Sequence, residues 1–165
     1  CNLVQEEKLG LAIVNMEQFN IDKFESRVLA KEQLVYVVSK NHPMSGKKYM
    51  TIEDFKDEKL VMFNVDSVQN ELLKNRFDGL NISPHIIMRS SQLYTTLKFV
   101  DKGNCGCFLF SDMLPHFREY VGIPLKPSID VKIGIIWKKE KFLSHSAQLF
   151  IDFAMQYCSE KIITP

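Results

Sequence analysis

The segment of residues 31–43 restricts the fold of this chain most strongly, because residues 34–38 are an unbroken apolar run. Most of these side chains are β-branched or aromatic, and a run without polar alternation predicts a strand buried on both faces. Pro43 cannot donate to a sheet ladder, so we expect the strand to end by His42. Such strands are usual in parallel sheets covered by helices, and we interpret this one as a link between two lobes.

Strand and helix signals alternate along the rest of the chain, which is typical of an α/β fold with parallel crossovers. The expected strands cover residues 9–15, 28–42, 60–63, 85–88, 105–110, 121–125 and 131–137. Side chains that cap helix N-termini predict four helix starts. The expected caps are Thr51, Asp66, Ser90 or Ser91, and Ser144.

Three finer expectations concern the placement of side chains within these elements. Asp66 and Gln69 have the spacing of a capping box at the start of a helix over residues 67–77. Gly106, inside an expected strand, indicates a bulge or a close approach of two backbones. The last helix is expected to bury one apolar face, formed by Leu149, Phe150, Phe153, Ala154 and Tyr157.

The charge and cysteine content exclude several classes of protein. With 21 basic and 20 acidic residues, the chain has no basic surplus for binding nucleic acid or anionic membranes by itself. No apolar run approaches the roughly 20 residues of a membrane-spanning helix. The four cysteines and four histidines lack zinc-site spacing, and Cys105 and Cys107 form C-x-C rather than the redox motif C-x-x-C. We therefore expect reduced cysteines, no metal and no cofactor.

Catalytic motifs are missing from the sequence. It contains no G-x-S-x-G elbow, no G-x-G-x-x-G loop, no P-loop and no H-E-x-x-H pair. Gly103 and Gly106 form a G-x-x-G at an expected helix end, where a turn is the ordinary interpretation. We therefore predict that the chain is not an enzyme.

Two passages carry a physical signal for ligand binding, at residues 63–67 and 88–92. In each, the carboxyl end of a strand meets a helix N-terminus, which is where open α/β sheets bind ligands and where backbone N–H groups can bind anions. Polar side chains could add hydrogen bonds there: Asn64, Ser67, Gln69, Ser90 and Ser91. Asp66 would repel an anion unless it points away as a cap. Ordinary helix capping without a ligand remains the alternative.

Taken in order, these segments resemble the effector-binding domain of LysR-type transcriptional regulators. The residues that carry the resemblance are L-G-L-A-I-V at 9–14, E-Q-L-V-Y-V-V-S at 32–39, N-H-P-M at 41–44, T-I-E-D-F at 51–55, L-V-M-F at 60–63, and F-I-D-F at 150–153. The spacing from Ser91 to Gly103 is also similar to a helix of that family. Together these segments cover nearly the whole chain.

The resemblance implies a fold like type II periplasmic binding proteins, with two lobes of mostly parallel sheets joined by two crossover strands. Residues 1–30 and 126–165 would belong to lobe I, which would lack its first strands, and residues 31–125 would form lobe II. A small, anionic or polar effector would lie in the cleft between the lobes. The implied contact residues are Asn15, Met16, Asn64, Val65, Asp66, Ser67, Gln69, Ser90, Ser91 and Gln92.

The resemblance also implies partners and a compartment. The regulator would be a cytoplasmic homo-oligomer, a dimer or tetramer, which contacts DNA only through a separate N-terminal helix-turn-helix domain. Some family members have an arginine where Asn15 stands, so a simple carboxylate effector is in doubt at that position. Cys105 and Cys107 do not match the reactive pair of the peroxide-sensing members.

The first residue, Cys1, leaves an alternative open. We expect a fragment of a longer regulator, but Cys1 could also be the lipidated residue of an extracytoplasmic solute-binding lipoprotein with the same fold. If the first strands of lobe I are absent, the strand over residues 9–15 should form an exposed parallel edge.

Overall fold

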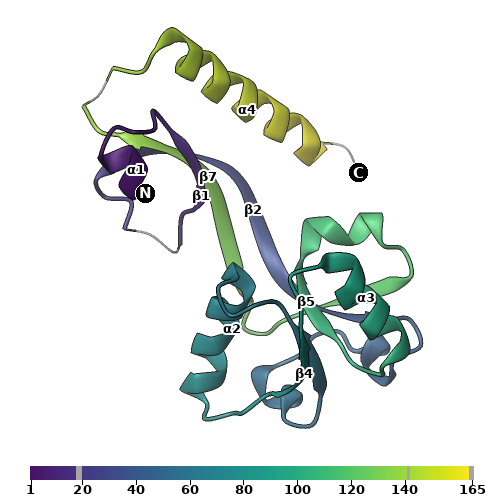
Figure 1. Cartoon of the computed structure of the whole chain (residues 1–165). Coiled ribbons are helices and arrows are strands. Elements are labelled where there is room, and N and C mark those ends of the chain that lie inside the picture. Colours follow the sequence, from purple (N-terminus) through teal and green to yellow (C-terminus); the bar gives the residue numbers. More distant parts are fainter. Residues whose placement is uncertain (18–19, 141, 164–165) are drawn as a thin grey trace. The chain divides into compact units, whose positions relative to one another are not determined.

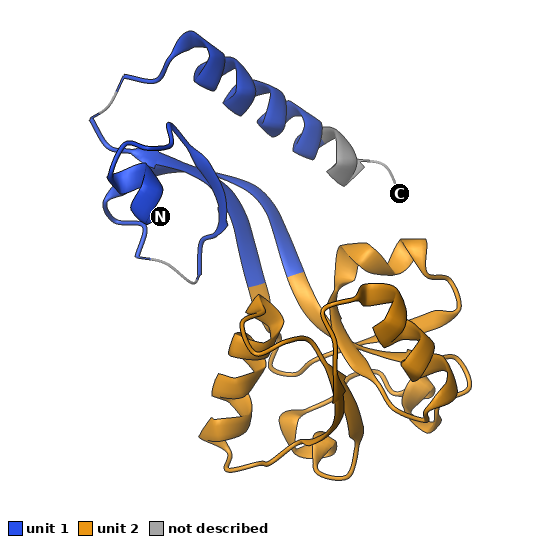
Figure 2. Ribbon diagram, viewed as in Figure 1, with its two compact units in different colours: residues 1–32, 131–165 blue, residues 33–130 orange. Residues whose placement is uncertain are grey.

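The computed structural model describes residues 1–17, 20–140 and 142–163, and it divides into two compact units. Unit 1 contains residues 1–32 and 131–165, and unit 2 contains residues 33–130 (Figure 2). The chain passes between them within strand β2 (Phe24–Ser39) and returns at the start of strand β7 (Asp130–Lys138). Strand β6 (Tyr120–Pro124) pairs with β2 inside unit 2. Equating these units with lobes I and II stays a prediction.

Unit 1 combines a small antiparallel sheet with helices α1 (Asn2–Gln5) and α4 (His145–Ile163) (Figure 1). Strand β1 (Ala12–Asn15) lies at the sheet edge and pairs antiparallel with β7, which separates it from β2. Within the described residues, β1 has no other strand partner. The expected edge is therefore present, but its expected parallel direction is wrong, because β7 runs opposite to β1.

Helix α4 begins as expected and buries a different face from the one expected. The backbone N–H of Ala147 donates to Ser144 Oγ over 3.2 Å, which confirms the cap. Ile151 and Ala154 are buried, however, whereas four of the five expected core residues are exposed: Leu149, Phe150, Phe153 and Tyr157. Apolar residues occur nearly all around this helix, so their spacing could not identify the sector that packs on Leu29 and Ile135 of the sheet.

Unit 2 contains the remaining elements (Figure 1). Its strands after β2 are β3 (Lys59–Met62), β4 (His85–Arg89), β5 (Cys107–Phe110) and β6. Its α-helices are α2 (Val68–Gly79) and α3 (Leu93–Lys102). Short 3-10 helices cover Pro43–Gly46, Ile52–Phe55 and Ser111–His116. Within the described residues, every helix is too short or too polar to span a lipid bilayer.

Strand β2 is the centre of unit 2, and its apolar run is buried on both faces as predicted. Leu34, Tyr36 and Val38 pack into one hydrophobic cluster, and Val35 and Val37 pack into a second on the opposite face. The strand ends at Ser39, before Pro43. Alternating side chains point to opposite faces of a sheet, so an unbroken apolar run requires a core on each side.

The expectation of mostly parallel sheets is wrong. Strand β2 pairs antiparallel with both β5 and β6, and β1 pairs antiparallel with β7. Among the described residues, the only extended parallel ladder joins β3 and β4, besides two isolated parallel bridges. An apolar run reports that both faces of a strand are covered, and it carries no information about the direction of the neighbouring strands.

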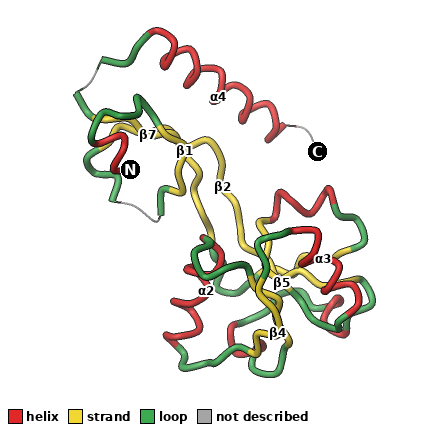
Figure 3. The backbone as a smooth tube through the Cα atoms, viewed as in Figure 1, coloured by secondary structure: helices red, strands yellow, loops and turns green. Residues whose placement is uncertain are grey.

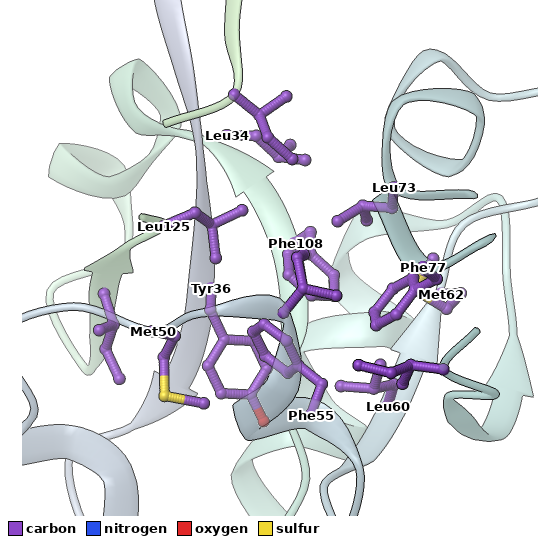
Figure 4. Packing of buried hydrophobic residues seen from close by; sticks show 14 of the residues in the cluster. Leu34, Tyr36, Met50, Phe55, Leu60, Met62, Leu73, Phe77, Phe108 and Leu125 are labelled. Carbon is purple, nitrogen blue, oxygen red and sulfur yellow. The ribbon is translucent and has the colours of Figure 1, made fainter. Parts of the chain in front are cut away.

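The larger cluster is organised around aromatic rings that surround Tyr36 (Figure 4). The ring centroids of Phe55 and Phe108 lie 4.9 and 5.4 Å from that of Tyr36. The buried Tyr36 hydroxyl donates to Glu58 Oε2 over 2.9 Å, so its polar end has a partner. A Cβ at Gly106 would clash with the Tyr36 ring, so the close approach at this glycine is to a side chain and not, as expected, to a second backbone.

Candidate functional site

Strands β3 and β4 lie side by side and parallel, so both run into their helices at the same edge of the sheet. The backbone N–H of Ser90 donates to the carbonyl oxygen of Met62 over 3.1 Å and joins the two passages directly. Helices α2 and α3 cover opposite faces of this strand pair (Figure 3), since Leu73 belongs to one hydrophobic cluster and Leu97 to the other. The structure thus brings the two predicted binding passages together.

At the first passage, three predicted residues are exposed: Asn64, Val65 and Asp66. Ser67 and Gln69 are half-buried. The cap of α2 is Ser67 rather than the expected Asp66, because the backbone N–H of Asn70 donates to Ser67 Oγ over 3.2 Å. The helix begins one residue later than the capping-box spacing required, which leaves Asp66 outside the helix.

At the second passage, the cap of α3 is Gln92 and not the expected Ser90 or Ser91. Ser90 Oγ instead accepts from the backbone N–H of Gln92 over 3.0 Å and forms the turn before the helix. The Gln92 side chain accepts from Thr95 Oγ1 rather than from the backbone, and no described side chain caps this helix. The first-turn N–H groups of α3, beside the exposed Ser91, can therefore donate to an anion.

Two residues that were not predicted connect the passages. Arg89, at the end of β4, donates from Nη1 to Asn70 Oδ1 over 2.7 Å and to the carbonyl oxygen of Phe63 over 3.1 Å. The buried Asn70 side chain also donates to the carbonyl oxygen of Val65 over 3.2 Å. The guanidinium is thus fixed at the shared edge, and within the described residues its Nε and Nη2 atoms have no acceptor.

A bulge in β4 aims Arg89 at helix α2. Leu60 faces Ile86, but the next residue of β3 faces Met88, so Ile87 has no counterpart and is an extra residue. This insertion puts Arg89 opposite Met62, on the face that packs against α2, where regular alternation would have put it on the other face. Neither composition nor periodicity marks the bulge, so the role of Arg89 cannot be predicted from the sequence.

A cavity of about 380 Å³ opens beside the Arg89 guanidinium, between α2 and β4. Its volume is within the range of small-molecule sites in proteins. It is lined by Met62, Val65, Asn70, Lys74, Phe77, Asp78, Pro84, Ile86 and Arg89. Of the predicted site residues, Val65 alone belongs to this lining.

The remaining predicted residues, Asn15 and Met16, belong to unit 1. Asn15 ends β1 and is 8% exposed, and its Oδ1 accepts from the backbone N–H of Glu17 over 3.1 Å. Its Nδ2 is buried and has no partner within the described part of the chain. The Met16 side chain packs against Gly134 of β7. Whether these two residues share a ligand with those of unit 2 stays a prediction.

The cysteines and acidic residues do not form a reactive centre. All four cysteines are free, and burial raises the pKa of the Cys105 and Cys107 thiols, so both remain protonated and poorly nucleophilic. Over the described residues, no three His, Cys, Asp or Glu side chains are grouped so that they could hold a metal ion.

Residues 1–159 match the model of a family described as the LysR substrate binding domain. The chain is 26% identical over 142 residues to YwbI, an uncharacterized HTH-type transcriptional regulator of Bacillus subtilis, covering 84% of this chain and 47% of that protein. It is 24% identical over 162 residues to the transcriptional dual regulator GltC of the same organism, covering 95% of this chain and 53% of that protein. The chain thus spans about half the length of these relatives.

Solved structures show the same fold. The regulatory domain of Synechocystis CcmR in complex with 2-PG superposes with a TM-score of 0.80 at 18% identity, covering 95% of this chain and 77% of that one. The effector-binding domain of QuiR in complex with shikimate superposes with a TM-score of 0.73 at 23% identity, covering 96% of this chain and 76% of that one. The predicted α/β class, like that of type II periplasmic binding proteins, is therefore confirmed.

Proposed function

The chain belongs to the LysR substrate binding domain family, and from this premise we propose that it senses a small anionic or polar metabolite at the edge where β3 and β4 end. One observation carries the proposal. Arg89 is fixed by Asn70 and Phe63 beside the N-termini of α2 and α3, so charge and backbone donors converge on one place. Guanidinium groups and helix N-termini both favour anionic ligands.

The site that we propose combines predicted and newly found residues. Asn64, Ser67, Gln69, Ser90, Ser91 and Gln92 supply polar groups around Arg89, and Val65 borders the adjoining cavity. Asp66 is exposed and outside the helix, so it can turn toward solvent. Two solved relatives are named as complexes with shikimate and with 2-PG, so related domains do bind small molecules.

For the whole protein, we propose a cytoplasmic LysR-type regulator that reads DNA through a separate N-terminal helix-turn-helix domain. The names of the relatives YwbI and GltC, both transcriptional regulators, support this assignment over a solute-binding lipoprotein. If the homo-oligomer has two conformations, an effector would shift the equilibrium toward the conformation that it binds more tightly. The size of the shift would be set by the difference between its two affinities.

The test is a thermal-shift screen of the chain against small carboxylates, phosphate esters and neutral polyols. A ligand that binds only the native state stabilises it by about 2.7 kcal/mol at 100 times its Kd. We expect anions to raise the Tm and Arg89→Gln to remove that increase. Arg118→Gln, which loses the same charge at an exposed position, is the matched control. An equal shift in the Arg89→Gln variant would overturn the proposal.

A further inference from the structure

The cavity between α2 and β4 is elongated along the axis of α2. Its α2 wall contains Asn70, Lys74 and Asp78, which follow at four-residue intervals along one face of the helix. Eight residues of helix rise by about 12 Å, so the lining extends well beyond the reach of a single carboxylate group. Arg89 lies beside Asn70 at the N-terminal end of this wall, and Asp78 lies at its C-terminal end.

The two ends of the cavity differ in charge, and the lining between them is apolar except for Lys74. The N-terminal end combines the Arg89 guanidinium with the positive end of the α2 dipole. The far end carries the Asp78 carboxylate at the negative end of that dipole, with Lys74 between them. The apolar lining consists of Met62, Val65, Phe77, Pro84 and Ile86.

From this arrangement we infer that the cavity selects the effector's class: a small organic monoanion with an apolar body. Its carboxylate pairs with the Nε and Nη2 edge of Arg89, and its apolar body lies between α2 and β4. This inference rests on the proposed function, because Arg89 is the anion-binding group in both. Arg89 and Lys74 carry two positive charges and Asp78 one negative charge, so the lining has a net charge of +1, which a single carboxylate neutralises. A second carboxylate would be left uncompensated near Asp78, so the site discriminates against long dicarboxylates.

The experiment titrates the ¹⁵N-labelled chain with three probes: propanoate, octanoate and octanedioate. Amide shifts of Ser67, Ser90 and Leu93 report the carboxylate end, and those of Lys74, Asp78 and Ile86 report the cavity. Each methylene that becomes buried raises the affinity roughly fourfold. We therefore expect octanoate to bind at least about tenfold more tightly than propanoate, and more tightly than octanedioate.

Four variants test the parts of the cavity separately: the charge at its far end, a matched exposed control, its width, and the Arg89 guanidinium. Asp78→Asn should bring the affinity for octanedioate close to that for octanoate, whereas Asp57→Asn, exposed before β3, should leave the preference intact. Ile86→Phe narrows the cavity and should reduce the advantage of octanoate over propanoate. Arg89→Lys, which keeps the charge and loses the planar fork, should weaken all three probes.

The outcomes distinguish the inference from the proposed function. If propanoate perturbs the strand-end amides but affinity does not rise with chain length, the cavity inference fails and the proposed anion site stands. If octanedioate binds as tightly as octanoate in the original chain, Asp78 has no selective role and the inference also fails. If none of the probes perturbs either group of amides, both are overturned.

Discussion

Gly106 shows how one missing side chain permits the packing of unit 2. The residue precedes β5 and lies against the ring of Tyr36, which is fully buried among Phe55 and Phe108. Displacing a buried ring in close-packed surroundings costs free energy, because the neighbouring side chains must shift as well. The glycine is therefore required by close approach rather than by backbone conformation, since no described glycine has a positive φ.

We predict that Gly106→Ala lowers the free energy of unfolding by about 1–3 kcal/mol, the usual cost of overpacking a core. Urea unfolding followed by circular dichroism measures the change. Gly79→Ala is the control, because a Cβ there meets nothing within 4 Å and alanine favours the helix. Equal stability of Gly106→Ala and the original chain would contradict the packing argument.

Asp54 provides a pH-dependent contact at the first turn of the Ile52–Phe55 helix. The hydrogen bond from Lys47 is the main cause that lowers the pKa of its carboxyl, and the backbone N–H of Thr51 adds to it. A carboxyl whose pKa is lower in the folded state stabilises the fold above its unfolded pKa of about 3.9. That stabilisation is lost as the pH falls through the folded-state pKa.

Asp54→Asn should therefore lower the urea midpoint at neutral pH, and the difference from the original chain should shrink below about pH 4. Lys47 and Asp54 are both about one-third exposed, so the effect is small. Midpoints measured at several pH values check this, with Asp57→Asn as the control. A difference that stays constant with pH would count against the assignment.

At the scale of elements, the β3–β4 pair and its two helices create the candidate site. A parallel pair places both strand ends at one edge, and the bulge at Ile87 turns Arg89 toward α2. The capping residues then determine which backbone donors remain available. Ser67 caps α2 with its side chain, whereas Gln92, the cap residue of α3, makes no side-chain hydrogen bond to the backbone of that helix.

Two alanine substitutions test whether Ser67 or Asp66 caps α2. Ser67→Ala should destabilise the chain by about 1 kcal/mol, because it removes the oxygen that accepts from the Asn70 N–H. Asp66→Ala should change stability by no more than about 0.5 kcal/mol, since Asp66 is exposed and outside the helix. The urea midpoints of the two variants, each compared with that of the original chain, measure both changes in stability. A larger loss for Asp66→Ala would restore Asp66 as the cap.

At the scale of the whole molecule, recognition and response belong to different parts of the proposed regulator. The described chain holds the effector-binding domain, and it spans about half the length of its relatives. Its net charge of +1 agrees with the proposal that DNA is contacted by another domain.

In the full-length protein, Arg89→Gln should keep operator affinity within about twofold without effector and abolish the change in affinity that effector causes, because coupling requires differential effector binding. Fluorescence anisotropy with labelled operator DNA, with and without octanoate, measures both quantities. A loss of operator binding in the absence of octanoate would show that Arg89 supports the fold or the oligomer instead.

The sequence alone determined the α/β class, the doubly buried strand β2, most of the element order and the two strand-to-helix passages. These features depend on local periodicity and composition, which the sequence displays directly. The order of the short sequence segments along the chain also identified the family by resemblance, without any information on contacts between them.

Only the tertiary structure decided strand direction, the buried face of α4, the caps at Ser67 and Gln92, and the role of Arg89. Strand direction depends on which distant segments pair, and the face of a helix that is apolar nearly all around depends on what packs against it. Arg89 reaches Asn70 because one residue of β4 is left out of register. Local sequence does not encode such a bulge, since it depends on how β4 pairs with β3, a strand that lies more than 20 residues earlier in the chain.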